Sequence, residues 1–148
     1  MFWRHGGADL ATFAASKQVS WSGYPPEAQF TESVLCCLVT SGDLSFRLKE
    51  WGVLPDIATV NYQTPADRSA LPFLAFANSS VCRCFLEYLT PTLNNTPGDI
   101  GKLPIKESLG CYRDVVLDLS SRLLRLSMED WDNSEASWGF SRHPLVKE

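Results

Sequence analysis

The segment 71–105 constrains the fold most strongly, because it changes from an apolar run to a helical pattern and then to a loop. Asn78 or Ser79 can serve as the N-cap of the helix. The apolar residues that follow at helical spacing are Val81, Phe85, Leu86 and Leu89. One face of the segment is therefore apolar, and we expect a helix over 79–89 that packs inward.

A polar surface loop is expected from Thr90 to Gly98. The residue before Pro91 is pushed out of the α region, so the helix should end there. The following stretch is rich in Asn, Thr, Pro and Gly, which is typical of loops. Asp99 is then expected to cap one short turn that Pro104 closes.

Strand signals dominate the segment 33–62. An apolar run at 34–39 is followed by Ser-Gly-Asp at 41–43, and apolar and polar residues then alternate over 44–48. This order predicts a β-hairpin, and a further strand is expected at about 57–62.

A last long helix is expected at about 108–128. Its apolar stripe, which we expect to dock on the hairpin, consists of Val115, Val116, Leu119, Leu123 and Leu126. Asp118 and Arg122 are four residues apart and can pair on the outer side. We expect Trp131 and Trp138 to pack in the core or at an interface with an absent domain. The expected fold class is α+β, with a small antiparallel sheet packed by two or more helices.

Composition supports one folded domain. The chain has 148 residues, of which 45% are hydrophobic, and a formal net charge of -4. A negative net charge is unusual for a module that binds a phosphate backbone, because such modules usually have a basic face. The five cysteines include no C-x-x-C spacing, so no metal site is expected. With no long apolar run, we expect a cytoplasmic protein without a membrane segment.

The order of residues in 71–105 resembles the target-recognition part of large adenine-specific DNA methyltransferases, most closely the PglX-type enzymes of BREX phage-defence systems. The matching residues are Phe76, Asn78-Ser79, Phe85-Leu86, Pro91-Thr92-Leu93-Asn94, Gly98-Asp99-Ile100 and Leu103-Pro104-Ile105. Two flanking pieces also match: Val39 to Arg47 with Gly52, and Asp130-Trp131-Asp132 with Glu135, Ser137-Trp138 and Gly139-Phe140.

The resemblance divides the chain into two regions. Residues 39–146 resemble the recognition region, whereas residues 1–38 are poorly patterned. Residues 1–38 are either a divergent or truncated edge of the family or the product of a frameshifted or misassigned start.

The resemblance also implies what this chain lacks. The full-length family binds S-adenosylmethionine through a Rossmann-like domain and holds the flipped adenine with an Asn/Asp-Pro-Pro-Tyr/Phe loop. The sequence contains no complete Rossmann pattern, and Tyr24-Pro25-Pro26-Glu27 is interpreted as an ordinary turn. We therefore expect no catalytic residue and no bound cofactor in this chain.

Six residues are candidates for contact with double-stranded DNA: Ser41, Arg47, Asn94, Asn95, Thr96 and Lys102. Asn can pair with adenine and Arg with guanine in the major groove, while Lys102 and Ser41 suit phosphate oxygens. A structural role is the alternative for each of them. Asn94 and Asn95 can serve the loop backbone alone, and Arg47 can be an exposed strand residue.

Two classes of function follow. The first is a partial adenine-specific DNA methyltransferase, whose catalysis depends on a companion chain or a missing part. The alternative is a noncatalytic remnant or an adaptor that binds other phage-defence components. A neighbouring gene that encodes the Gly-rich turn and the Asn-Pro-Pro-Tyr loop would favour the first.

Overall fold

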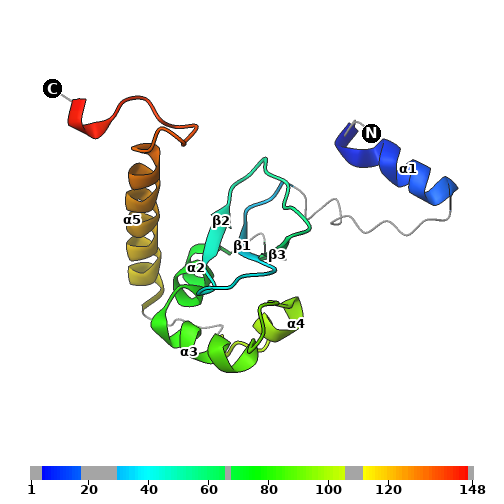
Figure 1. The fold of residues 1–148 in the computed structure, drawn as a ribbon, viewed down its shortest axis with the longest axis horizontal. Coiled ribbons are helices and arrows are strands. Elements are labelled where there is room, and N and C mark those ends of the chain that lie inside the picture. Colours follow the sequence, from blue (N-terminus) through cyan, green and yellow to red (C-terminus); the bar gives the residue numbers. More distant parts are fainter. Residues whose placement is uncertain (1–4, 18–29, 66–67, 106–111, 147–148) are drawn as a thin grey trace.

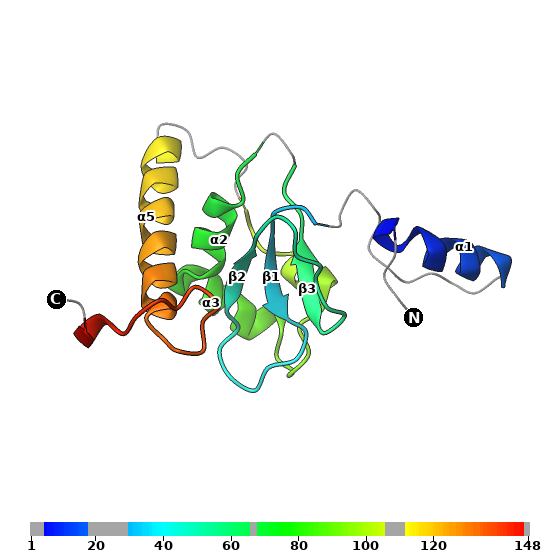
Figure 2. The same cartoon turned by 90° about the horizontal axis from the view of Figure 1, so that it is seen from above.

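A small antiparallel sheet with helices on one face forms the centre of the molecule (Figures 1 and 2). The structure, a computed structural model, describes residues 5–17, 30–65, 68–105 and 112–146. The antiparallel sheet and its helices confirm the α+β class expected from the sequence. The predicted turn at Tyr24-Pro25-Pro26-Glu27 lies outside the described residues.

The sheet has three strands, β1 (Ser33–Cys37), β2 (Phe46–Lys49) and β3 (Thr59–Tyr62), in the order β2-β1-β3. Both outer strands run antiparallel to β1, so the predicted hairpin and the further strand are confirmed. Strand β1 ends earlier than the apolar run at 34–39. Leu38 and Thr40 donate backbone hydrogen bonds to Ala58 and Leu93 rather than to β2, and a wide loop over 38–45 replaces the predicted tight turn.

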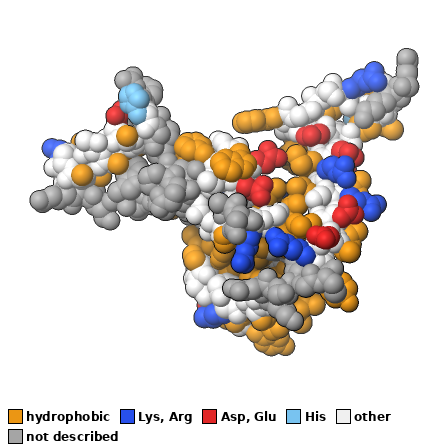
Figure 3. All heavy atoms as spheres, turned by 180° about the vertical axis from the view of Figure 1, so that it is seen from behind, with side chains coloured by type: hydrophobic (Ala, Val, Ile, Leu, Met, Phe, Trp, Pro, Cys, Tyr) orange, Lys and Arg blue, Asp and Glu red, His pale blue; other side chains and the backbone are white. Residues whose placement is uncertain are grey.

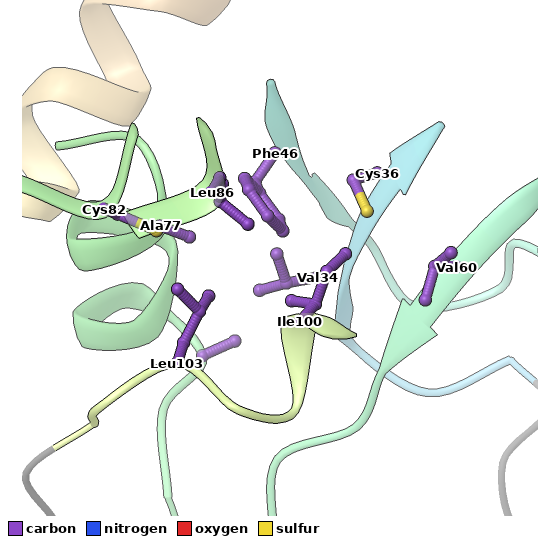
Figure 4. Packing of buried hydrophobic residues seen from close by; sticks show 10 residues of the cluster. Val34, Cys36, Phe46, Val60, Ala77, Cys82, Leu86, Ile100 and Leu103 are labelled. Carbon is purple, nitrogen blue, oxygen red and sulfur yellow. The ribbon is translucent and has the colours of Figure 1, made fainter. Parts of the chain in front are cut away.

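One face of the sheet carries the hydrophobic core (Figure 4). Alternate strand residues point to this face, where side chains from the helical half of the chain cover them. Phe73 packs edge-on against Phe46 and Tyr62, with ring centroids 6.3 and 5.6 Å apart. The buried core residues are Val34, Cys36, Phe46, Val60, Ala70, Ala77, Cys82, Leu86, Ile100 and Leu103.

Two helices, α2 (Leu71–Ala77) and α3 (Ser80–Leu89), follow the sheet. Ser79 is the N-cap of α3, as expected, because its Oγ accepts a hydrogen bond from the Cys82 N–H at 3.2 Å. The predicted inward face of α3 is partly wrong. Cys82 and Leu86 are buried one turn apart against the sheet, whereas Val81 is 58% exposed and Phe85 is 42% exposed on the flank of that face.

The short helix α4 (Pro97–Ile100) has its N-cap at Thr96 rather than at Asp99. Thr96 Oγ1 accepts a hydrogen bond from the Asp99 N–H at 3.2 Å, so Thr96 is the N-cap and the prediction for Asp99 is wrong. Pro97 explains the earlier start, since proline suits the first helical position after a cap.

The last long helix, α5 (Arg113–Asp132), packs against α2 and not on the hairpin, which corrects our expectation. Helices α2 to α4 already cover the core face of the sheet, so α5 lies outside α2 (Figure 2). Its expected start at Ser108 lies outside the described residues, and its end lies four residues beyond the expected Met128. The predicted Asp118–Arg122 pair is present at 3.9 Å.

Most of the predicted stripe on α5 is exposed. The exposed members and their exposed fractions are Val115 54%, Leu119 49%, Leu123 65% and Leu126 62%. Figure 3 shows hydrophobic side chains among acidic and basic ones over α5, on the right of that view. Trp131 and Trp138 are also exposed, so neither packs in a core.

The N-terminal part contains a helix and one strand of the sheet. The helix α1 (Ala8–Ser16) follows a short 3-10 turn, η1 (His5–Gly7). Because β1 is the central strand, the sheet begins before residue 39. At the other end, η4 (Pro144–Val146) is a further 3-10 turn. No helix in the described ranges combines the length and apolarity needed to cross a membrane.

Candidate nucleic-acid interface

Two loops that are distant in sequence lie side by side and form the candidate interface. The β1–β2 loop and the segment 92–96 are joined by Thr40 N–H donating to the Leu93 carbonyl at 3.0 Å and Asn95 N–H donating to the Leu38 carbonyl at 2.7 Å. Val39 and Asn94 form an isolated antiparallel bridge between them. We call this pair of segments, 38–45 and 92–96, the two-loop surface.

Asn95 is the anchor of the two-loop surface. It is 3% exposed, and its Nδ2 donates a hydrogen bond to the Cys37 carbonyl at 3.2 Å. Asn95 therefore has a structural role, which was the alternative to base contact. Its side chain binds the backbone of β1, however, and not the backbone of its own loop. In this conformation its amide is turned away from solvent and is not available to a base.

Asn94 and Ser41 present free polar groups on the same surface. Both are exposed, and neither side chain makes a hydrogen bond within the described ranges. Thr96 is exposed, but its hydroxyl already donates to Asp99 Oδ2 at 2.7 Å while capping α4. Asn94 and Ser41 are therefore the candidates best placed for direct hydrogen bonds to a ligand.

Lys102 lies beside the second loop and is held by a carboxylate. Its Nζ donates to Asp99 Oδ1 at 2.8 Å, and the Lys102 side chain remains 63% exposed. The hydrogen bond from Lys102, followed by the one from Thr96, lowers the pKa of Asp99 below its usual value. Lys102 is thus connected to the two-loop surface through Asp99 and Thr96.

Arg47 lies on the opposite face of the sheet from the core residue Phe46, as the alternation of a strand requires. It is exposed and faces Leu35 across the β1–β2 pair. Within the described ranges no hydrogen bond or ion pair joins its guanidinium to the two loops, so the structure separates Arg47 from the other candidates.

Arg83 is a residue that the sequence reasoning missed. Its Nη1 lies 3.1 Å from Asp43 Oδ2, and Asp43 is two residues after Ser41 in the β1–β2 loop. Both side chains are more than half exposed. The only signal in the sequence was an arginine on the polar side of α3, and nothing local connects it to a loop 40 residues earlier.

The chemistry available at this surface is hydrogen bonding and charge pairing. In the described ranges no group of three His, Cys, Asp or Glu side chains is arranged to hold a metal ion. The nearby Cys36 is buried, which raises the pKa of its thiol to about 12, and the neighbouring Cys37 adds to this effect. The surface can therefore bind a polar ligand, and it offers no activated nucleophile.

Comparison with known proteins gives two relatives. No protein-family model matches the chain. An adenine-specific methyltransferase PglX of Lacticaseibacillus casei (strain Zhang) is 28% identical over 146 residues, which cover 97% of this chain and 12% of that protein. An adenine-specific methyltransferase BrxX of Escherichia coli O9:H4 (strain HS) is 28% identical over 120 residues, which cover 80% of this chain and 10% of that protein.

These matches confirm a distant similarity to PglX- and BrxX-type adenine-specific methyltransferases. The chain spans only about a tenth of the length of these two relatives. The similarity also reaches further than the range 39–146 that we expected. Residues 1–38 are 38 of 148, or about a quarter of the chain, so a match over 97% includes most of them.

Proposed function

We propose that this chain is a target-recognition segment of an adenine-specific DNA methyltransferase. In this proposal it helps to select the site whose adenine receives a methyl group from S-adenosylmethionine. One observation carries the proposal: the two-loop surface joins parts of two segments that resemble the family, Val39 to Arg47 and Pro91 to Asn94, and it exposes Ser41 and Asn94.

The exposed groups of this surface match the edges of DNA bases. A free Asn amide has the donor and acceptor needed to pair with adenine in the major groove, and a Ser hydroxyl can bind either a base or a phosphate oxygen. Arg83 and Lys102 lie at the two sides of the surface and supply positive charge for the backbone.

The residues of this chain do not fit S-adenosylmethionine. That cofactor needs a Gly-rich turn between a strand and a helix, and the connection between β3 and α2 contains no glycine. Cofactor binding and methyl transfer are therefore assigned, within this proposal, to a part of the enzyme outside this chain or to a companion methyltransferase chain.

Fluorescence anisotropy with labelled duplexes across a salt series tests the proposal. We expect salt-dependent binding that Asn94→Ala and Lys102→Ala weaken. Arg125→Ala removes an exposed cation from α5 and is the matched control for Lys102→Ala, and it should bind like the wild type. Absence of binding at low salt by a protein whose circular dichroism shows that it is folded would overturn the proposal.

A second candidate function is a noncatalytic adaptor that binds other phage-defence proteins. The exposed apolar residues of α5 favour it, because large apolar side chains exposed along one helix are typical of a protein-binding surface. Retained folding without DNA binding, together with association through α5, would support this candidate over the first.

A further inference from the structure

Two cations beside the two-loop surface, Arg83 and Lys102, are each held by a carboxylate that belongs to, or is bonded to, one of the two loops. Asp43 of the β1–β2 loop pairs with Arg83, whose Nη1 lies 3.1 Å from Asp43 Oδ2. Asp99, which accepts the hydroxyl of Thr96, binds Lys102 at 2.8 Å. The same arrangement, a carboxylate between the loop and a long basic side chain, thus occurs at both sides of the surface.

These ion pairs are weak enough to exchange partners. The Arg83 and Asp43 side chains are 59% and 69% exposed, whereas Lys102 is 63% exposed and its partner Asp99 is 28% exposed. Exposed pairs contribute little to stability, since solvent screens them and their long side chains keep many alternative conformations. A phosphate oxygen of DNA can replace either carboxylate as the partner of the cation, but the phosphate has to compete with that carboxylate.

We propose that Asp43 and Asp99 are specificity-determining residues that lower the affinity of the two-loop surface for the DNA backbone by holding Arg83 and Lys102. This inference rests on the proposed function. Backbone binding is independent of sequence and grows with the number of phosphates that a protein neutralises. With both cations held back, binding depends more on the hydrogen bonds of Ser41 and Asn94 to the bases, and the ratio of specific to nonspecific affinity rises.

The chain offers a matched set of variants for a test. Asp43→Asn and Asp99→Asn each remove one negative charge beside the surface. Asp118→Asn removes the same charge from an exposed ion pair on α5, where Asp118 and Arg122 are 3.9 Å apart. Each variant changes the net charge equally, so a difference between them reports position and not overall charge.

The readout is the affinity for a random-sequence duplex, measured by fluorescence anisotropy across a salt series. Each loop variant should bind about three- to tenfold more tightly at low salt, and the salt slope should steepen by about one for each cation released. Asp118→Asn should stay within about twofold of the wild type, because screening limits the effect of a distant exposed charge.

A second arm tests whether Arg83 carries the gain. Asp43→Asn combined with Arg83→Ala should return to the affinity of Arg83→Ala alone. Asp99→Asn leaves one acceptor oxygen for the hydrogen bonds from Thr96 and Lys102 and can disturb α4, whereas no further side-chain hydrogen bond or ion pair of Asp43 is seen in the described ranges. The Asp43 variants therefore decide the question even if Asp99→Asn folds poorly.

The outcomes separate the inference from the proposed function. If the wild type binds DNA and Asp43→Asn binds it with the same affinity, the inference is overturned and DNA recognition stands. The same holds if Asp118→Asn gains as much affinity as the loop variants. No binding by any variant, including the double variant Asp43→Asn/Asp99→Asn, would overturn both. Tighter binding by the loop variants alone, over a wild type that itself binds DNA, would support the inference.

Discussion

Asn78 binds the backbone of Phe46 through both atoms of its side-chain amide. Its Oδ1 accepts a hydrogen bond from the Phe46 N–H at 3.0 Å, and its Nδ2 donates to the Phe46 carbonyl at 3.0 Å. The same Nδ2 also donates to the Leu74 carbonyl at 3.1 Å. One side chain therefore takes the place of a neighbouring strand at the edge of β2 and fixes the junction of α2 and α3 to the sheet.

Asn78→Ala should lower the free energy of unfolding by about 1–3 kcal/mol, because it removes two hydrogen bonds from the edge of β2. Urea denaturation followed by circular dichroism measures the change. Asn94→Ala is the control, since Asn94 is exposed and its side chain makes no hydrogen bond to the residues that the structure describes; it should change the free energy of unfolding by less than about 0.5 kcal/mol. Equal effects of the two changes would contradict the role of Asn78.

Asn95→Ala should loosen the two-loop surface without unfolding the sheet. The change removes the hydrogen bond to the Cys37 carbonyl, so the backbone bonds of Thr40 and Asn95 that join the loops should open more often. Hydrogen exchange of these two amides should become faster. Asn94→Ala should leave both exchange rates unchanged, and faster exchange in that variant would show that the anchor has been misidentified.

Local signals in the sequence predicted the three strands, α3 and α5, but they predicted neither α1 nor α2, nor how the elements face one another. The N-cap at Ser79 and the strands around 33–62 follow from residue types a few positions apart. The inward side of α5 could not be found in this way, because an apolar stripe does not reveal which neighbour covers it. The sheet was already covered by α2 to α4, and the stripe was left exposed.

For the candidate site too, the local features were predicted from the sequence and the contacts between distant segments were not. The loop at 92–96 was predicted from its Asn, Thr and Pro residues, and the structure places it at the surface. The role of Asn95 depends on Cys37, a contact 58 positions away, and Arg83 joins the site only through Asp43. Contacts between distant segments are absent from any local pattern, so these two roles required the structure.

Lys49→Met should lower the free energy of unfolding by about 1–3 kcal/mol. Lys49 is only 3% exposed, and its Nζ donates to the carbonyls of Thr31 and Val53, which lose these bonds in the variant. Met retains the apolar stem, so the effect reports the ammonium group. Arg47→Met, an exposed position on the same strand, is the control and should change the free energy of unfolding by less than about 0.5 kcal/mol.

The pH dependence gives Lys49 a second test. Burial lowers the pKa of Lys49 below its usual 10.5. Between the lowered pKa and 10.5 the unfolded chain holds more protons at this group than the folded chain, so its contribution to the free energy of unfolding rises with pH. The difference between wild type and Lys49→Met, measured by urea denaturation, should increase through this window. A difference that does not change with pH would contradict a buried ammonium.

Thiol labelling should separate the four cysteines that the structure describes into two pairs. Cys37 and Cys84 are exposed and should react with N-ethylmaleimide at pH of about 8, whereas Cys36 and Cys82 are buried and should react only after unfolding in urea. Burial raises the pKa of both buried thiols, that of Cys36 to about 12. Peptide mapping by mass spectrometry identifies each site. Labelling of Cys82 as fast as that of Cys84 would contradict the packing of α3.

Leu119→Ser combined with Leu123→Ser should reduce self-association at high protein concentration while leaving the free energy of unfolding nearly unchanged. Both side chains are about half or more exposed on α5, so they are available to another surface and contribute little to the fold. Size-exclusion chromatography with light scattering measures association, and urea denaturation measures stability.

Leu124→Ala provides the opposite control on the same helix. Leu124 is half-buried on the side of α5 that includes the buried Ser120, and α5 packs against α2. Its truncation should lower the free energy of unfolding by about 1–2 kcal/mol and leave association unchanged, because less apolar surface is then buried in the fold. If Leu119→Ser/Leu123→Ser destabilised the protein as much as Leu124→Ala, the exposed stripe would have to be packed in solution, and α5 would not offer a binding face.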